Sequence, residues 1–176
     1  GYMVTEESPL RPSSPYARTK YMMEMVLRDL SAACEQMHGI ALRYFNPIGA
    51  DPQMRTGIHI QQPSHVLGKL VDVAMGKLPY FEITGTDWPT RDGTGIRDYI
   101  HVWDLAQAHV QAVTQFEDIY DRAGRPASRY VVINLGTGRG VTVRELVEAF
   151  EKVIGHPINK KESPPRPGDV AGAYAN

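Results

Sequence analysis

Residues 14–47 read SPYARTKYMMEMVLRDLSAACEQMHGIALRYFNP and predict a helix followed directly by a strand. Ser14 is a favourable N-cap, and Pro15 suits the first helical position because an N–H there would have no partner. Apolar residues then recur with helical spacing at Tyr21, Met22, Met25, Val26, Leu30 and Ala33. The pattern predicts a helix from Pro15 onward that is ended by Gly39.

Residues 40–45 predict a short buried strand that stops at Asn46-Pro47. A residue before proline is held extended, which favours an Asn46 amide that points into the crevice at the carboxyl end of the strand. Open α/β sheets bind their ligands at that edge. An ordinary turn is the alternative interpretation of these residues.

The rest of the chain continues to alternate between helical and extended patterns. Further helices are predicted at residues 66–75, closed by Gly76, at residues 104–116, and at residues 142–155, opened by a capping box of Thr142 and Glu145. Extended segments are predicted at residues 80–84, 99–102 and 130–134. The alternation favours an α/β layered fold over a helical bundle or a sandwich.

Composition limits the class of protein. The 176 residues, 42% of them hydrophobic, suffice for one sizeable core. A formal net charge of -1 gives no reason to expect nucleic acid or an anionic membrane as a partner. The single cysteine, Cys34, excludes an internal disulfide and suits a reducing compartment. There is no signal-peptide pattern and no apolar run of roughly 18 residues, so we expect a cytoplasmic protein without a membrane partner.

Both ends of the sequence look cut. The chain enters a turn-rich stretch at residues 7–12, and it stops at residues 174–176 shortly after a proline-rich loop. No closing element is predicted there.

Tyr16 and Lys20 form the first candidate catalytic pair. Residues four apart on a helix share one face. A tyrosine with a pKa near ~10 is a poor base at neutral pH, and a nearby ammonium favours its phenolate. The pair could therefore serve as an acid/base, although a packed, solvated pair is the more frequent meaning of this spacing.

Two arginines stand in stiff or glycine-marked loops. Residues 92–104 read DGTGIRDYIHVWD and contain Arg97, and residues 164–169 read PPRPGD and contain Arg166. Two guanidinium groups suit a diphosphate, because each offers planar charge-assisted hydrogen bonds. A lone loop arginine is more often a surface charge.

Together these segments resemble the extended short-chain dehydrogenase/reductases and, among them, the UDP-galactose (UDP-glucose) 4-epimerases. The Tyr-x-x-x-Lys spacing is shared by the whole superfamily, whereas residues 45–50 (FNPIGA) and 92–102 are more specific. The resemblance covers essentially the whole chain. It implies an α/β fold in which residues 1–50 end an NAD-binding Rossmann domain and residues 51–176 form mainly a UDP-sugar-binding domain, with some segments returning to the Rossmann core.

The resemblance also implies roles for individual residues. Tyr16 would be the acid/base at the sugar C4 hydroxyl, with Lys20 tuning it and binding the nicotinamide ribose, and Phe45 would touch NAD. The implied contacts to UDP-glucose or UDP-galactose are Asn46, Arg97 and Arg166 at the phosphates, Asp169 at a ribose, and the segment Glu82, Ile83 and Thr84 at the uracil. Ala173 matches a position that limits room for the sugar's 2-substituent, so UDP-GlcNAc and UDP-GalNAc are possible further substrates. A homodimer is implied for the complete protein.

The sequence departs from the family pattern in several places. The Gly-rich loop of the NAD-binding half and the catalytic Ser or Thr upstream of the tyrosine are absent, so we expect this chain to be the C-terminal part of the enzyme. Residues 136–140 (GTGRG) fail as a dinucleotide fingerprint because Val141 stands where the third glycine belongs, which favours a structural turn. His65 stands where many members have asparagine. The histidines lack metal-ligand spacing, and no metal site is predicted.

Two alternatives stay open. The chain could belong to another NAD-dependent sugar-nucleotide enzyme, a dehydratase or decarboxylase, although no acidic residue flanks Tyr16 as a dehydrating pair would require. It could also be a non-catalytic UDP-sugar-binding fragment.

Overall fold

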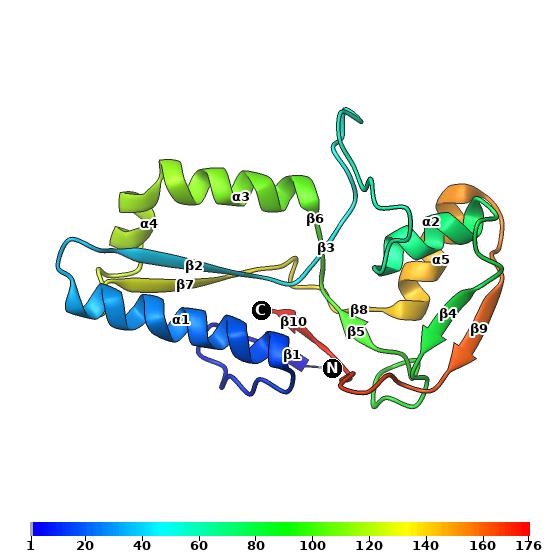
Figure 1. Ribbon diagram of the computed structural model, residues 1–176, viewed down its shortest axis with the longest axis horizontal. Helices are drawn as coiled ribbons and strands as arrows, with labels where there is room; N and C mark the ends of the chain where they lie inside the picture. Colours follow the sequence, from blue (N-terminus) through cyan, green and yellow to red (C-terminus); the bar gives the residue numbers. More distant parts are fainter. Residues whose placement is uncertain (1) are drawn as a thin grey trace.

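A computed structural model describes residues 2–176, so Gly1, the first residue of the expected first domain, lies outside the described part. The molecule is elongated, with two halves joined by extended segments near its centre (Figure 1). Its strands pair two by two, four pairs being parallel and one antiparallel. No helix within residues 2–176 combines the length and the hydropathy of a membrane span.

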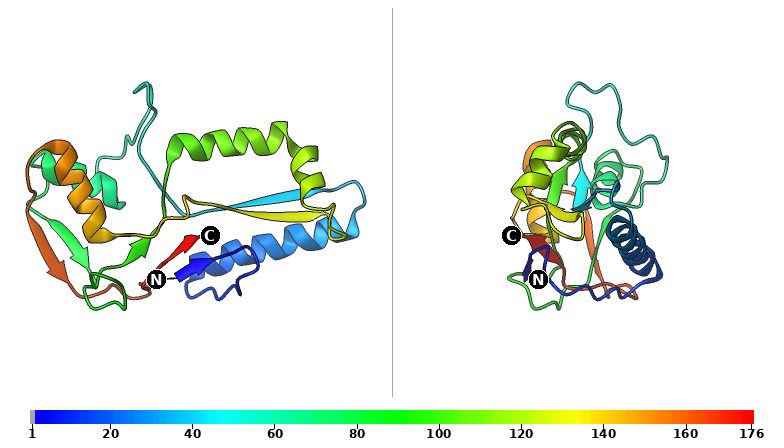
Figure 2. Two further views of the ribbon diagram at one scale, coloured as in Figure 1. Left: turned by 180° about the vertical axis from the view of Figure 1, so that it is seen from behind. Right: turned by 90° about the vertical axis from the view of Figure 1, so that its left-hand side faces the viewer.

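The first half is a strand pair between two layers of helices. Strand β2 (Gly39–Tyr44) runs parallel to β7 (Tyr130–Leu135) along its whole length. Helix α1 (Pro15–Ala33) covers one face, and α3 (Val102–Thr114) with α4 (Phe116–Arg122) lies over the other (Figures 1 and 2). This arrangement is the expected α/β layering.

Two short parallel pairs occupy the centre of the molecule. Strand β1 (Tyr2–Val4) pairs with β10 (Ala173–Ala175), and β3 (Asn46–Ile48) pairs with β6 (Tyr99–His101). The β1–β10 pair brings together the two ends of the described chain.

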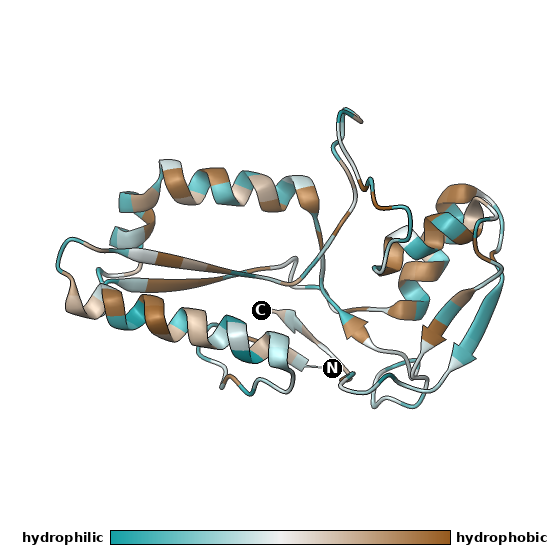
Figure 3. Ribbon diagram, viewed as in Figure 1, coloured by the Kyte–Doolittle hydropathy of each residue, from teal (hydrophilic) through white to brown (hydrophobic). Residues whose placement is uncertain are grey.

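The second half has its own apolar core. Strands β4 (Phe81–Thr84) and β9 (Lys160–Ser163) are parallel, and α2 (Val66–Ala74) and α5 (Val143–Ile154) pack on them. The short strands β5 and β8 link this half to the centre as an antiparallel pair, Ile96–Arg97 with Val141–Thr142. The buried core residues are Leu70, Val73, Phe81, Ile83, Val147 and Ile158. Hydrophobic colour accordingly gathers on α2, α5 and β4, whereas β9 is hydrophilic (Figure 3).

The predicted helix starts are confirmed by their caps. The Ser14 hydroxyl accepts the Ala17 N–H at 3.1 Å, and a proline follows at the helix start. At α5, Thr142 and Glu145 form the expected reciprocal capping box. Gly155, with φ 82°, ends that helix in the left-handed conformation.

The prediction that Gly39 ends α1 is wrong. The helix stops at Ala33, where Cys34 takes an extended conformation, and Gly39 begins β2. A Cβ on Gly39 would lie 3.1 Å from the Tyr130 ring on the neighbouring strand. The glycine therefore serves the close approach of β2 and β7, a long-range need that local sequence does not reveal.

The predicted strand does end before Asn46, because β2 stops at Tyr44, but a strand that the sequence did not predict, β3, begins at Asn46. The Asn46 N–H donates to the Asp98 carbonyl at 2.9 Å. Successive amides of a strand face opposite sides, so the nitrogen of Pro47 faces away from β6 and costs no ladder bond.

Three other boundaries differ from the sequence-based expectation. Helix α3 begins at Val102 with His101 as its N-cap, two residues before the predicted start. It ends at Thr114, and Phe116 opens the separate helix α4. Residues 173–175, for which no element was predicted, form β10 against β1.

Candidate active site

A cavity of about 370 Å³ opens between the second half of the molecule and the central strands. It gathers segments that are far apart in sequence: the start of β3, helix α2, strand β4, the β5–β6 segment and the loop before β10. The predicted substrate residues that line it are Asn46, Glu82, Thr84, Arg97, Arg166 and Asp169.

Asn46 reaches the cavity because of the β3–β6 pair. It stands opposite Tyr99 in the parallel register, and Tyr99 also lines the cavity. Burial raises the pKa of the Tyr99 phenol, and the neighbouring Arg97 charge only partly offsets this. Tyr99 is therefore a neutral hydrogen-bonding group at neutral pH.

Arg97 faces both the cavity and the chain that approaches β10. Its guanidinium donates to the Ile96 carbonyl at 2.6 Å and to the carbonyls of Val170 and Ala171 at 3.3 Å. Gly172, with φ 106°, follows at once, and a Cβ there would lie 1.8 Å from the Ile96 oxygen. The Arg97 side chain therefore links β5 to the segment that leads into Ala173. The sequence alone does not indicate this structural role.

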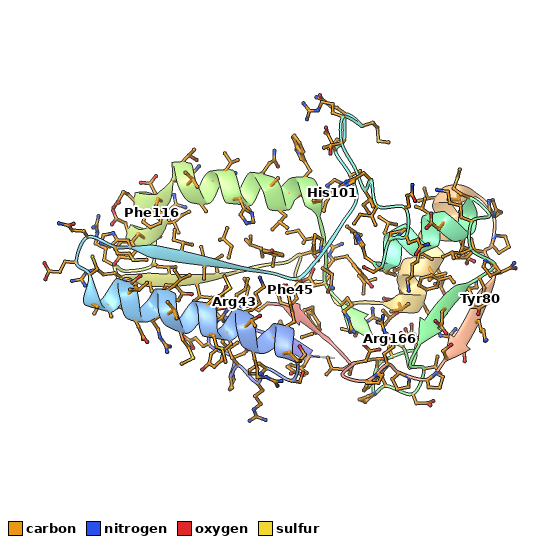
Figure 4. The ribbon with its side chains drawn as sticks, viewed as in Figure 1. Arg43, Phe45, Tyr80, His101, Phe116 and Arg166 are labelled. Atoms are coloured by element: carbon orange, nitrogen blue, oxygen red, sulfur yellow. The ribbon has the colours of Figure 1, made fainter. Side chains whose placement is uncertain are left out.

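Arg166 and Asp169 form one unit. The Asp169 carboxylate accepts the Arg166 backbone N–H at 3.0 Å and its Nε at 3.2 Å. The Arg166 side chain stays 63% exposed, so the pair holds the loop in shape while leaving guanidinium N–H groups available. Figure 4 shows Arg166 on the loop that leads from β9 to β10.

The predicted uracil segment, residues 82–84, forms β4. Ile83 is 1% exposed and belongs to the core, so it can offer a ligand only its backbone. Glu82 accepts a hydrogen bond from the Ser163 hydroxyl at 2.5 Å. Glu82 and Thr84 lie at the cavity, one on each side of the buried residue.

Tyr16 and Lys20 share a face of α1, as their spacing predicted. The Lys20 Nζ lies 5.3 Å from the centroid of the Tyr16 ring, a cation–π contact. Tyr16 is 71% exposed and is not part of the cavity lining. Within residues 2–176 neither the phenol nor the ammonium has a hydrogen-bond partner, so both groups are free to meet other molecules.

Two further predicted residues also lie outside the cavity lining. Phe45 is half-buried where β2 passes into β3, at the junction between the halves (Figure 4). Its N–H donates to the Leu135 carbonyl at 3.2 Å. Ala173 is half-buried in β10, opposite Tyr2. The structure therefore separates the predicted residues that line the cavity from those that lie outside its lining.

Asp98 is a buried acid that the sequence analysis left without a role. It is 0% exposed, and its carboxylate accepts four hydrogen bonds. The donors are the Thr137 N–H and hydroxyl, the Gly138 N–H and the Ala175 N–H, at 2.7–3.1 Å. A Cβ on Gly136 would lie 2.4 Å from one carboxylate oxygen. The residues 136–140 loop thus wraps a carboxylate, in agreement with its predicted structural role.

A second carboxylate, Asp92, fixes the glycine-marked loop. It accepts from the Thr94 N–H and hydroxyl at 2.8 and 2.7 Å and from the Thr142 hydroxyl at 2.5 Å. Burial alone would raise the pKa of Asp92, but these hydrogen bonds hold it below the ordinary value. The capping residue Thr142 therefore joins the loop before β5 to the start of α5.

Lys69 and His65 also line the cavity, from α2. His65 is the N-cap of α2 and makes no side-chain capping bond. Lys69 was absent from the predicted set because no sequence pattern surrounds it. No group of three or more His, Cys, Asp or Glu in the described residues could hold a metal ion.

Comparison with known proteins identifies the family. Residues 3–133 match the NAD dependent epimerase/dehydratase family. The chain is 44% identical over 174 residues to the UDP-glucose 4-epimerase of Bacillus subtilis, covering 98% of this chain and 49% of that protein. It thus spans about half the length of the curated relatives it matches.

Solved structures agree with this assignment. A UDP-glucose 4-epimerase from Bifidobacterium longum in complex with NAD+ and UDP matches with a TM-score of 0.88 and 39% identity, over 99% of this chain and 50% of that one. The UDP-glucose 4-epimerase from Stenotrophomonas maltophila, with bound NAD and formylated UDP-arabinopyranose, matches with a TM-score of 0.87 and 40% identity. The match covers 98% of this chain and 49% of that one. These matches confirm the α/β fold of the extended short-chain dehydrogenase/reductases, and the chain belongs to the NAD dependent epimerase/dehydratase family.

Proposed function

We propose that this chain supplies the UDP-sugar site and the Tyr-Lys pair of an NAD-dependent UDP-glucose 4-epimerase. The observation that carries the proposal is the convergence of six predicted substrate residues on one cavity from segments distant in sequence. Family membership supports it independently. The activity belongs to the complete protein, of which the relatives suggest this chain is about half.

The cavity suits a nucleoside diphosphate. Arg166, in a proline-flanked loop, keeps guanidinium donors exposed, and Asn46 offers an amide from the start of β3. Charge-assisted hydrogen bonds of this kind favour phosphate oxygens. The backbone of residues 82–84 would bind the uracil, and Asp169 would contact a ribose hydroxyl while it still pairs with Arg166.

The residues present fit one end of NAD. Tyr16 and Lys20 present a free phenol and ammonium from the first turns of α1, and Phe45 lies at the carboxyl end of β2, where α/β sheets bind nucleotides. They would hold the nicotinamide and its ribose. The residues 136–140 loop does not suit the pyrophosphate, because the Asp98 carboxylate already fills it.

Tyr16 would carry the proton chemistry at the sugar. Its phenolate takes the proton from the C4 hydroxyl, and its phenol returns that proton after the sugar has turned, while the Lys20 ammonium stabilises the charged form. Bound NAD would supply the hydride acceptor and donor, so that a 4-keto sugar is formed and then reduced on its other face.

The remaining expectations complete the proposal. Residues 1–50 would end the NAD-binding domain, and residues 51–176 would form mainly the UDP-sugar-binding domain, with α3 and β7 returning to the first. Exposed Met22 and Val26 on α1 support a homodimer, and a cytoplasmic location stays an expectation from the sequence. The small Ala173 in β10 supports acceptance of UDP-GlcNAc and UDP-GalNAc as well.

Epimerisation of UDP-galactose by the full-length protein tests this function. Arg166→Met should raise KM for UDP-galactose with little effect on bound NAD, whereas Arg125→Met, on the far side of the first half, should leave both unchanged. Release of a dehydrated or decarboxylated product would show instead that the protein is a sugar-nucleotide dehydratase or decarboxylase. Binding of UDP without any turnover would favour a non-catalytic UDP-sugar-binding protein.

A further inference from the structure

Lys69 lies in the first half of α2 and lines the 370 Å³ cavity. It is half-buried, and within residues 2–176 its ammonium makes no ion pair and no hydrogen bond. Two other lysines of this half have carboxylate partners: Lys77 pairs with Asp72 at 3.6 Å, and Lys160 pairs with Glu151 at 2.5 Å. An ammonium that is half-buried without a counter-charge lacks part of its hydration and gains by meeting an anion.

The other two cations of the cavity have hydrogen-bond partners within the protein. Arg97 donates to three backbone carbonyls, and Arg166 is bound to the Asp169 carboxylate. Glu82, the second carboxylate at the cavity, accepts from Ser163. Three cations and two carboxylates therefore line the cavity, and Lys69 is the cation among them whose charged group makes no hydrogen bond within the described residues.

The fold holds Lys69 firmly in this place. The next residue, Leu70, is 0% exposed and anchors α2 in the core. At the preceding residue, a Cβ on Gly68 would lie 2.5 Å from Pro63, so the start of the helix packs closely on the loop before it. The backbone of Lys69 is thus fixed from both sides, while its side chain remains free to reach an anion in the cavity.

We propose that Lys69 binds a phosphate oxygen of the nucleotide sugar from the α2 side of the cavity. This inference rests on the proposed function and adds a third, uncommitted cation to the diphosphate site. An ammonium acts as a point charge with three rotatable donors, so it can follow a phosphate that the fixed guanidinium groups hold in place. It is a binding residue and takes no part in the proton chemistry at C4.

The test is the affinity of the purified protein for UDP and for uridine, measured by calorimetry. Lys69→Met should weaken UDP binding about 10- to 100-fold, as expected for the loss of a charge-assisted bond, and should leave uridine binding unchanged. Lys69→Arg should keep part of the affinity. Lys77→Met, which removes a lysine near the end of the same helix but outside the cavity, should bind UDP like the unaltered protein.

The outcomes separate this inference from the proposed function. If the unaltered protein binds UDP and Lys69→Met binds it equally well, Lys69 has no phosphate role and the proposed function stands. If uridine binding falls as much as UDP binding, the lysine acts through the shape of the site and the inference is overturned. Failure of the unaltered protein to bind UDP removes both. Should Lys69→Met melt earlier than the unaltered protein, Lys69→Gln repeats the comparison with a polar side chain.

Discussion

Replacing Asp98 by asparagine should destabilise the centre of the molecule strongly. The carboxylate is fully buried and accepts four hydrogen bonds, two at each oxygen. An asparagine amide has one acceptor oxygen, and its NH₂ group would face two donors wherever it is placed. Two buried donors lose their acceptor at about 1–3 kcal/mol each, so the free energy of unfolding should fall by about 2–5 kcal/mol.

Urea unfolding followed by circular dichroism measures this loss. Asp29→Asn is the matched control, because Asp29 is exposed on α1 and makes no hydrogen bond or ion pair within the described residues. Gly136→Ala should destabilise similarly, since its new Cβ would lie 2.4 Å from the Asp98 carboxylate. A loss of less than roughly 0.5 kcal/mol for Asp98→Asn, as for an ordinary surface change, would refute the central role of this carboxylate.

Three further predictions follow from the site. Gly172→Ala should lower both the melting temperature and the affinity for UDP, because φ at this residue is 106° and the new Cβ would lie 1.8 Å from the Ile96 oxygen. Unchanged UDP affinity would contradict the link between Arg97 and the β10 segment. Asp92→Asn should cost about 1–2 kcal/mol of unfolding free energy near neutral pH. Its depressed pKa means that the ionised form stabilises the fold above about pH 4, so the difference from the unaltered protein should shrink as the pH falls below that value in urea titrations at several pH values. Tyr16→Phe in the full-length protein should reduce kcat for UDP-galactose at least ~100-fold while the Kd for UDP stays unchanged, since the phenol is outside the cavity; an equal loss of UDP binding would speak against its assigned role.

Local signals in the sequence predicted those features that depend on neighbouring residues. Ser14-Pro15 and the Thr142–Glu145 box marked two helix starts because caps act within one turn. Gly39 misled the prediction because its purpose is contact with Tyr130, on a strand far along the chain. Strand β10 escaped notice because its partner, β1, lies at the other end of the sequence.

The same distinction holds for the candidate site. Residues 45–50, 92–104 and 164–169 pointed to Asn46, Arg97 and Arg166, and the fold brings all three to one cavity. The sequence could not show that Arg97 also donates hydrogen bonds to the carbonyls of Val170 and Ala171. No sequence pattern surrounds Lys69, and only the lining of the cavity shows it to be a candidate binding residue.

A crystal structure of the full-length protein with UDP would show whether this cavity is the nucleotide site. We expect the diphosphate in the 370 Å³ cavity between Arg166, Asn46 and Lys69, with the uracil against the backbone of residues 82–84. UDP bound elsewhere, or a diphosphate that touches none of these three side chains, would contradict it.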